Sequence, residues 1–263
     1  MSTSAEPKST IARLGGWLVS FSKLERIIAA FCMAIPYFLI LADCSERDGF
    51  WVLIGKSLLV AAMPLAMTWI VIKSAKKKKP WLTFMGVVGL IAILYVVYLI
   101  VMPQCEPRSS ISAFVAMHNA HVFGALLSIA ATLFIYNGII YFWGSPSTPD
   151  ARKTLMAKRS ISKWYNAVIG ILLFGVVFFP CTNPDLKTLH FICAGAFFGL
   201  NAIVIGFVNE QKHRLIGILL MITSVSALGL YFYNGSVTLF WAESVALWVI
   251  GVHYILESLD LMS

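Results

Sequence analysis

Charged residues are scarce in this chain. Lys, Arg, Asp and Glu together make up 12% of its 263 residues, whereas hydrophobic residues make up 59%. A soluble globular domain carries about 25% charged residues, so a soluble domain is excluded as the main body of the protein. The longest hydrophilic stretch between apolar runs, residues 145–163, is too short to bury a core of its own. The composition predicts an integral membrane protein.

Strand-like alternation of apolar and polar residues is also absent, which leaves helices as the structures that satisfy the backbone in lipid. Crossing about 30 Å of hydrocarbon takes roughly 20 helical residues. Eight apolar runs approach or exceed this length, and we expect one all-α membrane bundle of eight transmembrane helices in four hairpins. The runs are Leu24–Leu41, Phe50–Ile72, Trp81–Met102, Ala113–Trp143, Trp164–Phe179, Leu189–Val208, Leu215–Tyr233 and Val237–Leu256.

A single domain, residues 24–258, is expected to hold all eight helices, with a weak repeat between residues 24–143 and 164–258. Residues 1–23 precede this domain. Their apolar side chains fall at helical spacing and no small-residue cleavage motif follows them. This segment is therefore predicted to be a cytoplasmic amphipathic helix on the membrane surface rather than a removed signal peptide.

Basic residues are distributed unevenly between alternate loops. By the positive-inside rule, the asymmetry predicts that both termini are cytoplasmic in a plasma or inner membrane. It also accounts for the net charge of +8 without a nucleic-acid partner. Of the 20 Lys and Arg residues, those on the cytoplasmic side are Lys8, Arg13, Lys23, Arg26, Lys73, Lys76, Lys77, Lys78, Lys79, Arg152, Lys153, Lys158, Arg159, Lys163, Lys212 and Arg214.

Two segments that combine proline and cysteine, "MPQCEP" at 102–107 and "FPCTNP" at 179–184, end apolar runs on the predicted external side. Proline has no backbone N–H and restricts the residue before it, so each segment stops a helix and fixes a turn. Cys44, Cys105 and Cys181 hold corresponding positions at the ends of three runs. One disulfide with a free thiol, or three free thiols, both fit this pattern.

Ionisable residues inside apolar runs are functional candidates, because each costs roughly 2.5–3.5 kcal/mol on membrane-insertion scales. Here they gather toward the external half of five different runs. If these helices are neighbours, the side chains line one polar pocket in the external leaflet, and we predict that this pocket binds a ligand. The candidate residues are His190, Glu243, Asp43, His118, His121 and Lys56, with His190 and Glu243 foremost.

Several interpretations of this polar layer stay open. His118 and His121, three residues apart on a helix, could join His190 and a carboxylate around zinc and activate water for lipid hydrolysis. The same groups could instead hold a lipid headgroup or small ligand with no bond broken, or could simply extend to interfacial water. The fourth run exceeds the hydrocarbon thickness, which places the histidine pair near the surface and weakens the zinc interpretation.

A polar stripe follows Glu243 along the last run. His253, Tyr254 and Glu257 project to a broadly similar helix face, which suits a proton or ion path and equally suits a helix that packs its least apolar face inward. The sequence contains no Walker phosphate loop, G-x-S-x-G elbow, H-E-x-x-H or C-x-x-C motif. No catalytic residue is therefore assigned and no cofactor is expected.

Three segments near the C-terminus resemble the DRAM-, Frag- and Sfk-type membrane protein family and related bacterial domains of unknown function. They read "FPCTNPDLKTLHFICAGAFFG", "HRLIGILLMITSVSALGLYF" and "FWAESVALWVIGVHYILES". The resemblance covers about residues 164–258 and implies an association with lipids, regulation or lipid-anchor remodelling more than a defined catalytic mechanism. The matching positions are His190, Ala194, Phe197, Phe198, Ala242 and Glu243.

These features together favour a membrane sensor or a lipid- or small-ligand-binding regulator. Membrane lipids and a small ligand or ion are the expected partners, and nucleic acid is not. A metal-dependent intramembrane lipid hydrolase and a channel or transporter centred on Glu243 are the alternatives.

The predicted orientation is tested by accessibility in intact cells. An impermeant maleimide should label Cys181 without permeabilisation, whereas trypsin should cleave the lysine-rich turn at residues 73–79 only after permeabilisation, because the two segments lie on opposite sides. Labelling and cleavage from the same side would contradict the orientation.

Overall fold

The computed structural model describes residues 24–44, 108–117, 120–143, 164–208 and 214–258, and every regular element in these ranges is a helix. The all-α prediction is confirmed for this part of the chain. The elements are α2 (Leu24–Cys44), the 3-10 helix η1 (Ile111–Ala116), α5 (Ala120–Trp143), α7 (Trp164–Phe178), α8 (Lys187–Ile203), the π-helical η2 (Val204–Val208), α9 (Arg214–Asn234) and α10 (Leu239–Ser258).

Four segments of the described chain are long and apolar enough to cross a membrane, which supports an integral membrane protein. α7 is equally apolar but has only 15 residues. Two of the eight predicted runs, residues 50–72 and 81–102, lie outside the described residues, as does the predicted surface segment 1–23. The four segments are Ala120–Ile139, Lys187–Val208, Arg214–Asn234 and Leu239–Glu257.

The fourth apolar run does not form the single helix predicted over Ala113–Trp143. Ser110 begins η1 by accepting a hydrogen bond from the N–H of Ala113 at 3.1 Å. The extended backbone of Met117 (φ −78°, ψ 160°) then ends η1, and α5 starts at Ala120. The run is therefore divided between a short turn and a separate helix.

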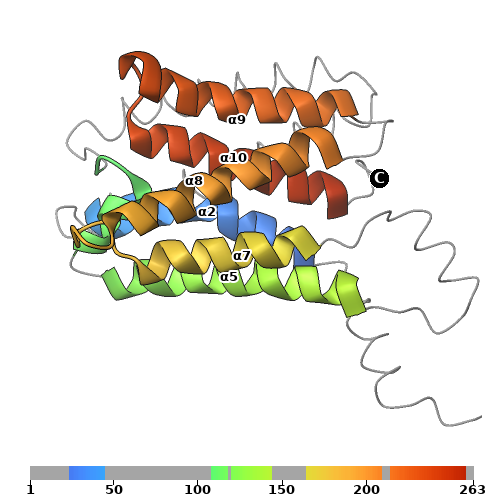
Figure 1. Cartoon of the computed structure of the whole chain (residues 1–263), viewed down its shortest axis with the longest axis horizontal. Coiled ribbons are helices and arrows are strands. Elements are labelled where there is room, and N and C mark those ends of the chain that lie inside the picture. Colours follow the sequence, from blue (N-terminus) through green and yellow to red (C-terminus); the bar gives the residue numbers. More distant parts are fainter. Residues whose placement is uncertain (1–23, 45–107, 118–119, 144–163, 209–213, 259–263) are drawn as a thin grey trace, which may run out of the picture.

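α10 forms the interior of the bundle. In the most apolar part of the Leu239–Glu257 segment 89% of the residues are buried inside the protein, whereas in that of the Arg214–Asn234 segment of α9 only 22% are. Figure 1 shows α10 lying between α9 on one side and α2 on the other, and it packs against both. A helix that is apolar all round is typical of such a central position.

Aromatic rings join the central helix to its neighbours. Trp248 of α10 stacks on Tyr37 of α2, with 5.2 Å between the ring centroids. Tyr254 meets Phe134 of α5 edge-on at 5.3 Å, and Phe134 in turn meets Phe197 of α8 at 6.0 Å. These offset and edge-on pairs each add about 0.5–1.5 kcal/mol beyond the area they bury.

Small residues bring some helices unusually close together. A Cβ atom added at Gly170 of α7 would lie 2.6 Å from the carbonyl oxygen of Ala131 in α5, and one added at Gly175 would meet Cys193 of α8. Ala131 and Cys193 thus mediate close helix packing, whereas a Cβ atom added at Gly199 would meet nothing within 4 Å.

A buried hydrogen-bond network ties three helices together. Asn166 of α7 donates to the side-chain oxygen of Asn137 in α5 at 2.5 Å, and the hydroxyl of Tyr254 in α10 donates to Asn166 at 2.6 Å. Asn166 therefore bridges helices, whereas Asn201 donates to the carbonyl of Phe197 in its own helix.

The close approach of α5 and α7 generates a stability prediction. Gly170→Ala should destabilise the protein by about 1–3 kcal/mol, because the new methyl group meets backbone atoms that have no room to move. Gly199→Ala is the matched control and should change the unfolding midpoint little, since nothing lies within 4 Å of its added Cβ. Thermal unfolding of the purified protein measures both, and equal midpoints would refute the close contact.

Candidate functional site

His190 occupies the first turn of α8 and is held by carbonyl groups at the end of α7. Pro180 has no N–H, so the helical bond it would donate to the carbonyl of Val176 is missing. The Nδ1 atom of His190 lies 3.2 Å from that carbonyl oxygen and 2.8 Å from the carbonyl oxygen of Phe179. The imidazole therefore satisfies the carbonyl groups that the helix end leaves free.

The loop after α7 turns tightly enough to bring α8 back to this position. The N–H groups of Leu186 and Lys187 both donate to the carbonyl of Asn183, and the side chain of Asn183 accepts from the N–H of Asp185. The prediction that "FPCTNP" stops a helix and fixes a turn is confirmed. Its consequence is that His190 lies beside the residues that precede Pro180.

Glu243 occupies the beginning of α10 and is likewise held by the backbone. Its Oε2 atom accepts a hydrogen bond from the N–H of Ile111 at 2.7 Å, and the N–H of Phe240 donates to the carbonyl of Ser109 at 2.9 Å. Phe114 adds a ring contact to Phe240 at 5.6 Å. The Glu243 carboxylate thus attaches the η1 segment to the N-terminal end of the central helix.

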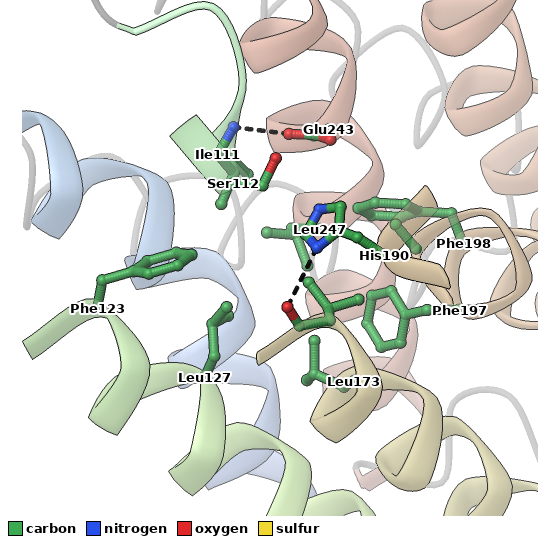
Figure 2. Close-up of a pocket in the computed structure, with 12 residues that line it drawn as sticks. Ile111, Ser112, Phe123, Leu127, Leu173, His190, Phe197, Phe198, Glu243 and Leu247 are labelled. Atoms are coloured by element: carbon green, nitrogen blue, oxygen red, sulfur yellow. Dashed lines mark hydrogen bonds between the residues drawn. The ribbon is translucent and has the colours of Figure 1, made fainter. Parts of the chain in front are cut away.

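His190 and Glu243 line the same cavity, which has a volume of about 40 Å³ (Figure 2). This is room for about three water molecules or a group of similar size. The two side chains are 3% and 8% exposed, respectively. The cavity is lined by Ile111, Ser112, Phe123, Leu127, Leu173, Val176, His190, Ala194, Phe197, Phe198, Glu243 and Leu247.

In the part of the chain that the structure describes, His190 and Glu243 each have one polar atom that is hydrogen-bonded to the protein and another that is not. Because Nδ1 of His190 lies beside two carbonyl oxygens, which only accept hydrogen bonds, Nδ1 has to be the donor. In a neutral imidazole, Nε2 is then left with a lone pair. Figure 2 shows Glu243 at the top of the cavity, with Ser112 beside it and His190 below. Within the described chain, no hydrogen bond engages Nε2 of His190 or Oε1 of Glu243.

The other predicted site residues do not join this cavity. Asp43 forms an ion pair with Arg108 at 2.9 Å, so its carboxylate is used in joining the end of α2 to the segment before η1. His121 lies exposed in the first turn of α5. His118 and Lys56 lie outside the described residues. The predicted pairing of His118 with His121 therefore also lies outside the described residues.

A metal-ligand cluster is not present in the described part of the chain, where no three His, Cys, Asp or Glu side chains come together. Cys181 is a free thiol, and its sulfur donates weakly to the carbonyl of Ser112 at 3.5 Å. Cys105 and the side chain of Cys44 lie outside what the structure describes.

The polar residues toward the end of α10 form a separate group. His253 and Glu257 approach each other at 4.0 Å, and the Tyr254 hydroxyl is bonded to Asn166. Ten residues of helix separate Glu243 from His253, which is about 15 Å, and this interval contains the buried apolar residues Leu247 and Ile250. The polar residues predicted to form one stripe along this helix therefore form two separate groups, one at Glu243 and one at His253, Tyr254 and Glu257.

Sequence reasoning missed the contribution of η1 to the site. Ser112 and the N–H of Ile111 reach the cavity only because the fourth run is broken. The segment "RSSIS" at residues 108–112 could have indicated the start of a separate helical turn, since serine favours the position that begins a helix. The apolar walls carried no such signal, because Phe123 and Leu127 resemble any other residues of an apolar helix.

Comparison with known families identified one match. A family of unknown function, DUF7103, matches residues 90–258, which include all of the residues that line the cavity. Searches of curated proteins and of solved structures found no match.

The contact between Glu243 and η1 can be tested by hydrogen exchange. Glu243→Ala should accelerate exchange of the Ile111 amide roughly 10- to 100-fold, because a hydrogen bond to a charged group contributes about 1.5–3 kcal/mol. Glu243→Gln should have a smaller effect, since its amide oxygen can still accept the bond. Unchanged exchange in Glu243→Ala would show that the carboxylate does not hold this segment.

Proposed function

Since the chain belongs to the family of unknown function DUF7103, we propose a function from the geometry of the site: it is a membrane regulator or sensor that binds the polar end of a lipid or similar amphiphile. The observation that carries this proposal is that His190 and Glu243, from two different helices, line one small cavity whose remaining walls are mostly apolar. A polar end beside an apolar wall matches the two parts of an amphiphile.

α8 and η2 pack against different helices along their length. Cys193, within α8, lies against Gly175 of α7, and Gly206 of η2 lies against Met221 of α9. Figure 1 shows α8 crossing the bundle obliquely. The cavity is lined by the α8 residues His190, Ala194, Phe197 and Phe198.

We place this cavity in the external leaflet of an eight-helix bundle with cytoplasmic termini. The support comes from the basic residues, because the loops on the opposite side of the predicted spans carry most of the Lys and Arg. The loop before α8 and the loop before α10 belong to the sparsely charged side. His190 and Glu243 each follow one of these loops by a few residues.

Binding fits the geometry better than conduction does. A proton or ion path along α10 would need polar groups in succession, and about 15 Å of helix with buried apolar side chains separates Glu243 from His253. The resemblance to the DRAM-, Frag- and Sfk-type proteins adds the expectation that the bound molecule is a lipid.

The test fills the cavity without changing its polar groups. Ala194→Phe places a ring among the cavity-lining residues, so the purified variant should retain much less tightly bound amphiphile than the wild type. Ala125→Phe makes the same change at an exposed position of α5 and is the control. Mass spectrometry of lipids extracted from washed protein measures the retained amount.

The proposal predicts close to one retained amphiphile per wild-type chain, the same for Ala125→Phe, and a severalfold loss for Ala194→Phe. Equal retention by all three proteins, or none by any, would overturn it. Comparable unfolding midpoints of the two variants establish that a loss of ligand is not a loss of fold.

A further inference from the structure

The atoms that face the cavity indicate which kind of polar group it accepts. Resting on the function proposed above, we infer that the cavity binds the primary ammonium group of an amphiphile. The group lies between Nε2 of His190 and the free oxygen of the Glu243 carboxylate. The hydrocarbon chain attached to it runs along the apolar wall.

The first argument is the balance of donors and acceptors. Because Nδ1 of His190 donates to the carbonyl groups of Val176 and Phe179, its Nε2 presents a lone pair. In its ionised form the carboxylate of Glu243 can only accept, and one of its oxygens is already engaged by the N–H of Ile111. A group bound between this carboxylate and Nε2 has to supply protons to both, and a primary ammonium supplies three.

The second argument is charge. Glu243 is 8% exposed, and in the described chain its side chain is bonded to the Ile111 amide and not to a basic side chain. A carboxylate removed from water is stabilised by a nearby opposite charge. Asp43 shows the contrast at the same end of the bundle, because Arg108 neutralises it directly. A ligand cation would complete the site at Glu243 in the same way.

The third argument is the nature of the wall. Phe123, Phe197 and Phe198 line the cavity, and aromatic rings attract cations through their faces. A volume of about 40 Å³ suits an ammonium group, which is similar in size to water, better than a bulky trimethylammonium group. A quaternary group also has no N–H to donate to Nε2. These features together favour a primary over a quaternary ammonium.

The experiment compares amphiphiles that share one chain and differ in the polar end. The full-length protein in phosphatidylcholine nanodiscs is titrated with dodecylamine, dodecyltrimethylammonium and dodecanol, and occupancy is followed by native mass spectrometry. Dodecylamine should bind roughly 10-fold or more tightly than either of the others, since a charge-assisted hydrogen bond contributes about that factor. Dodecyltrimethylammonium controls for attraction of any cationic detergent to the disc.

A pair of isosteric variants tests the role of the carboxylate. Glu243→Gln should lose the preference for dodecylamine while binding dodecanol about as well as the wild type. Asp185→Asn makes the same chemical change at an exposed loop position and should keep the preference. If Glu243→Gln does not fold, the comparison of the three amphiphiles on the wild type still decides the inference.

Two sources share this chemistry, namely an aminophospholipid headgroup and a free alkylamine. Discs in which phosphatidylethanolamine replaces part of the phosphatidylcholine separate them. A weaker apparent affinity for dodecylamine in those discs identifies the phospholipid as the occupant, and an unchanged affinity identifies the free amine. Both results support the ammonium assignment.

The binding results distinguish a wrong ammonium assignment from a wrong proposed function. Equal binding of the three amphiphiles, abolished by Ala194→Phe, would overturn the ammonium assignment and leave an amphiphile-binding cavity in place. Binding that Ala194→Phe does not alter would overturn both, because the occupant would then lie elsewhere.

Discussion

A backbone group that loses its hydrogen-bond partner inside a membrane has to find another, because lipid offers none. This constraint organises the candidate site. Pro180 leaves the carbonyl of Val176 without a helical donor, and His190 supplies one. The N–H of Ile111 lies in a short turn between apolar runs, and Glu243 accepts from it. Each of these polar side chains therefore satisfies a backbone group near a helix end with one of its polar atoms. Each also has a second polar atom that is not bonded to that backbone group.

The central helix α10 connects the cavity to buried contacts in the rest of the bundle. α10 begins at the cavity with Glu243 and ends near the network of Asn137, Asn166 and Tyr254, which joins it to α5 and α7. Between these two points Trp248 stacks on Tyr37 of α2, and Tyr254 itself also contacts Phe134 of α5. A change at the cavity that displaced the start of α10 would therefore act on buried contacts with three other helices. Sensing requires such a connection between a binding site and a packed core.

The sequence predicted the helical class, most helix positions and the turn at "FPCTNP", because long apolar runs and proline punctuation depend on local chemistry alone. It also identified His190 and Glu243, since ionisable residues stand out against an apolar background. It failed where tertiary contacts decide. Asp43 was predicted to line the same pocket as Glu243 and proved to be paired with Arg108. The broken fourth run separated His121 from the site, and the phenylalanine wall was indistinguishable from ordinary apolar helix surface.

Asp43 and Glu243 together show how a structural role and a binding role divide between similar residues. Both are carboxylates at the same end of the bundle, and both connect an α-helix to the segment around η1. Asp43 makes that connection through a full positive charge, so its electrostatic requirement is met within the protein. Within the described chain, Glu243 makes it through a single backbone N–H, which satisfies one of its two oxygens. The cavity lies beside the second carboxylate and not the first, and this difference is the reason for assigning the proposed ligand to Glu243 and not to Asp43.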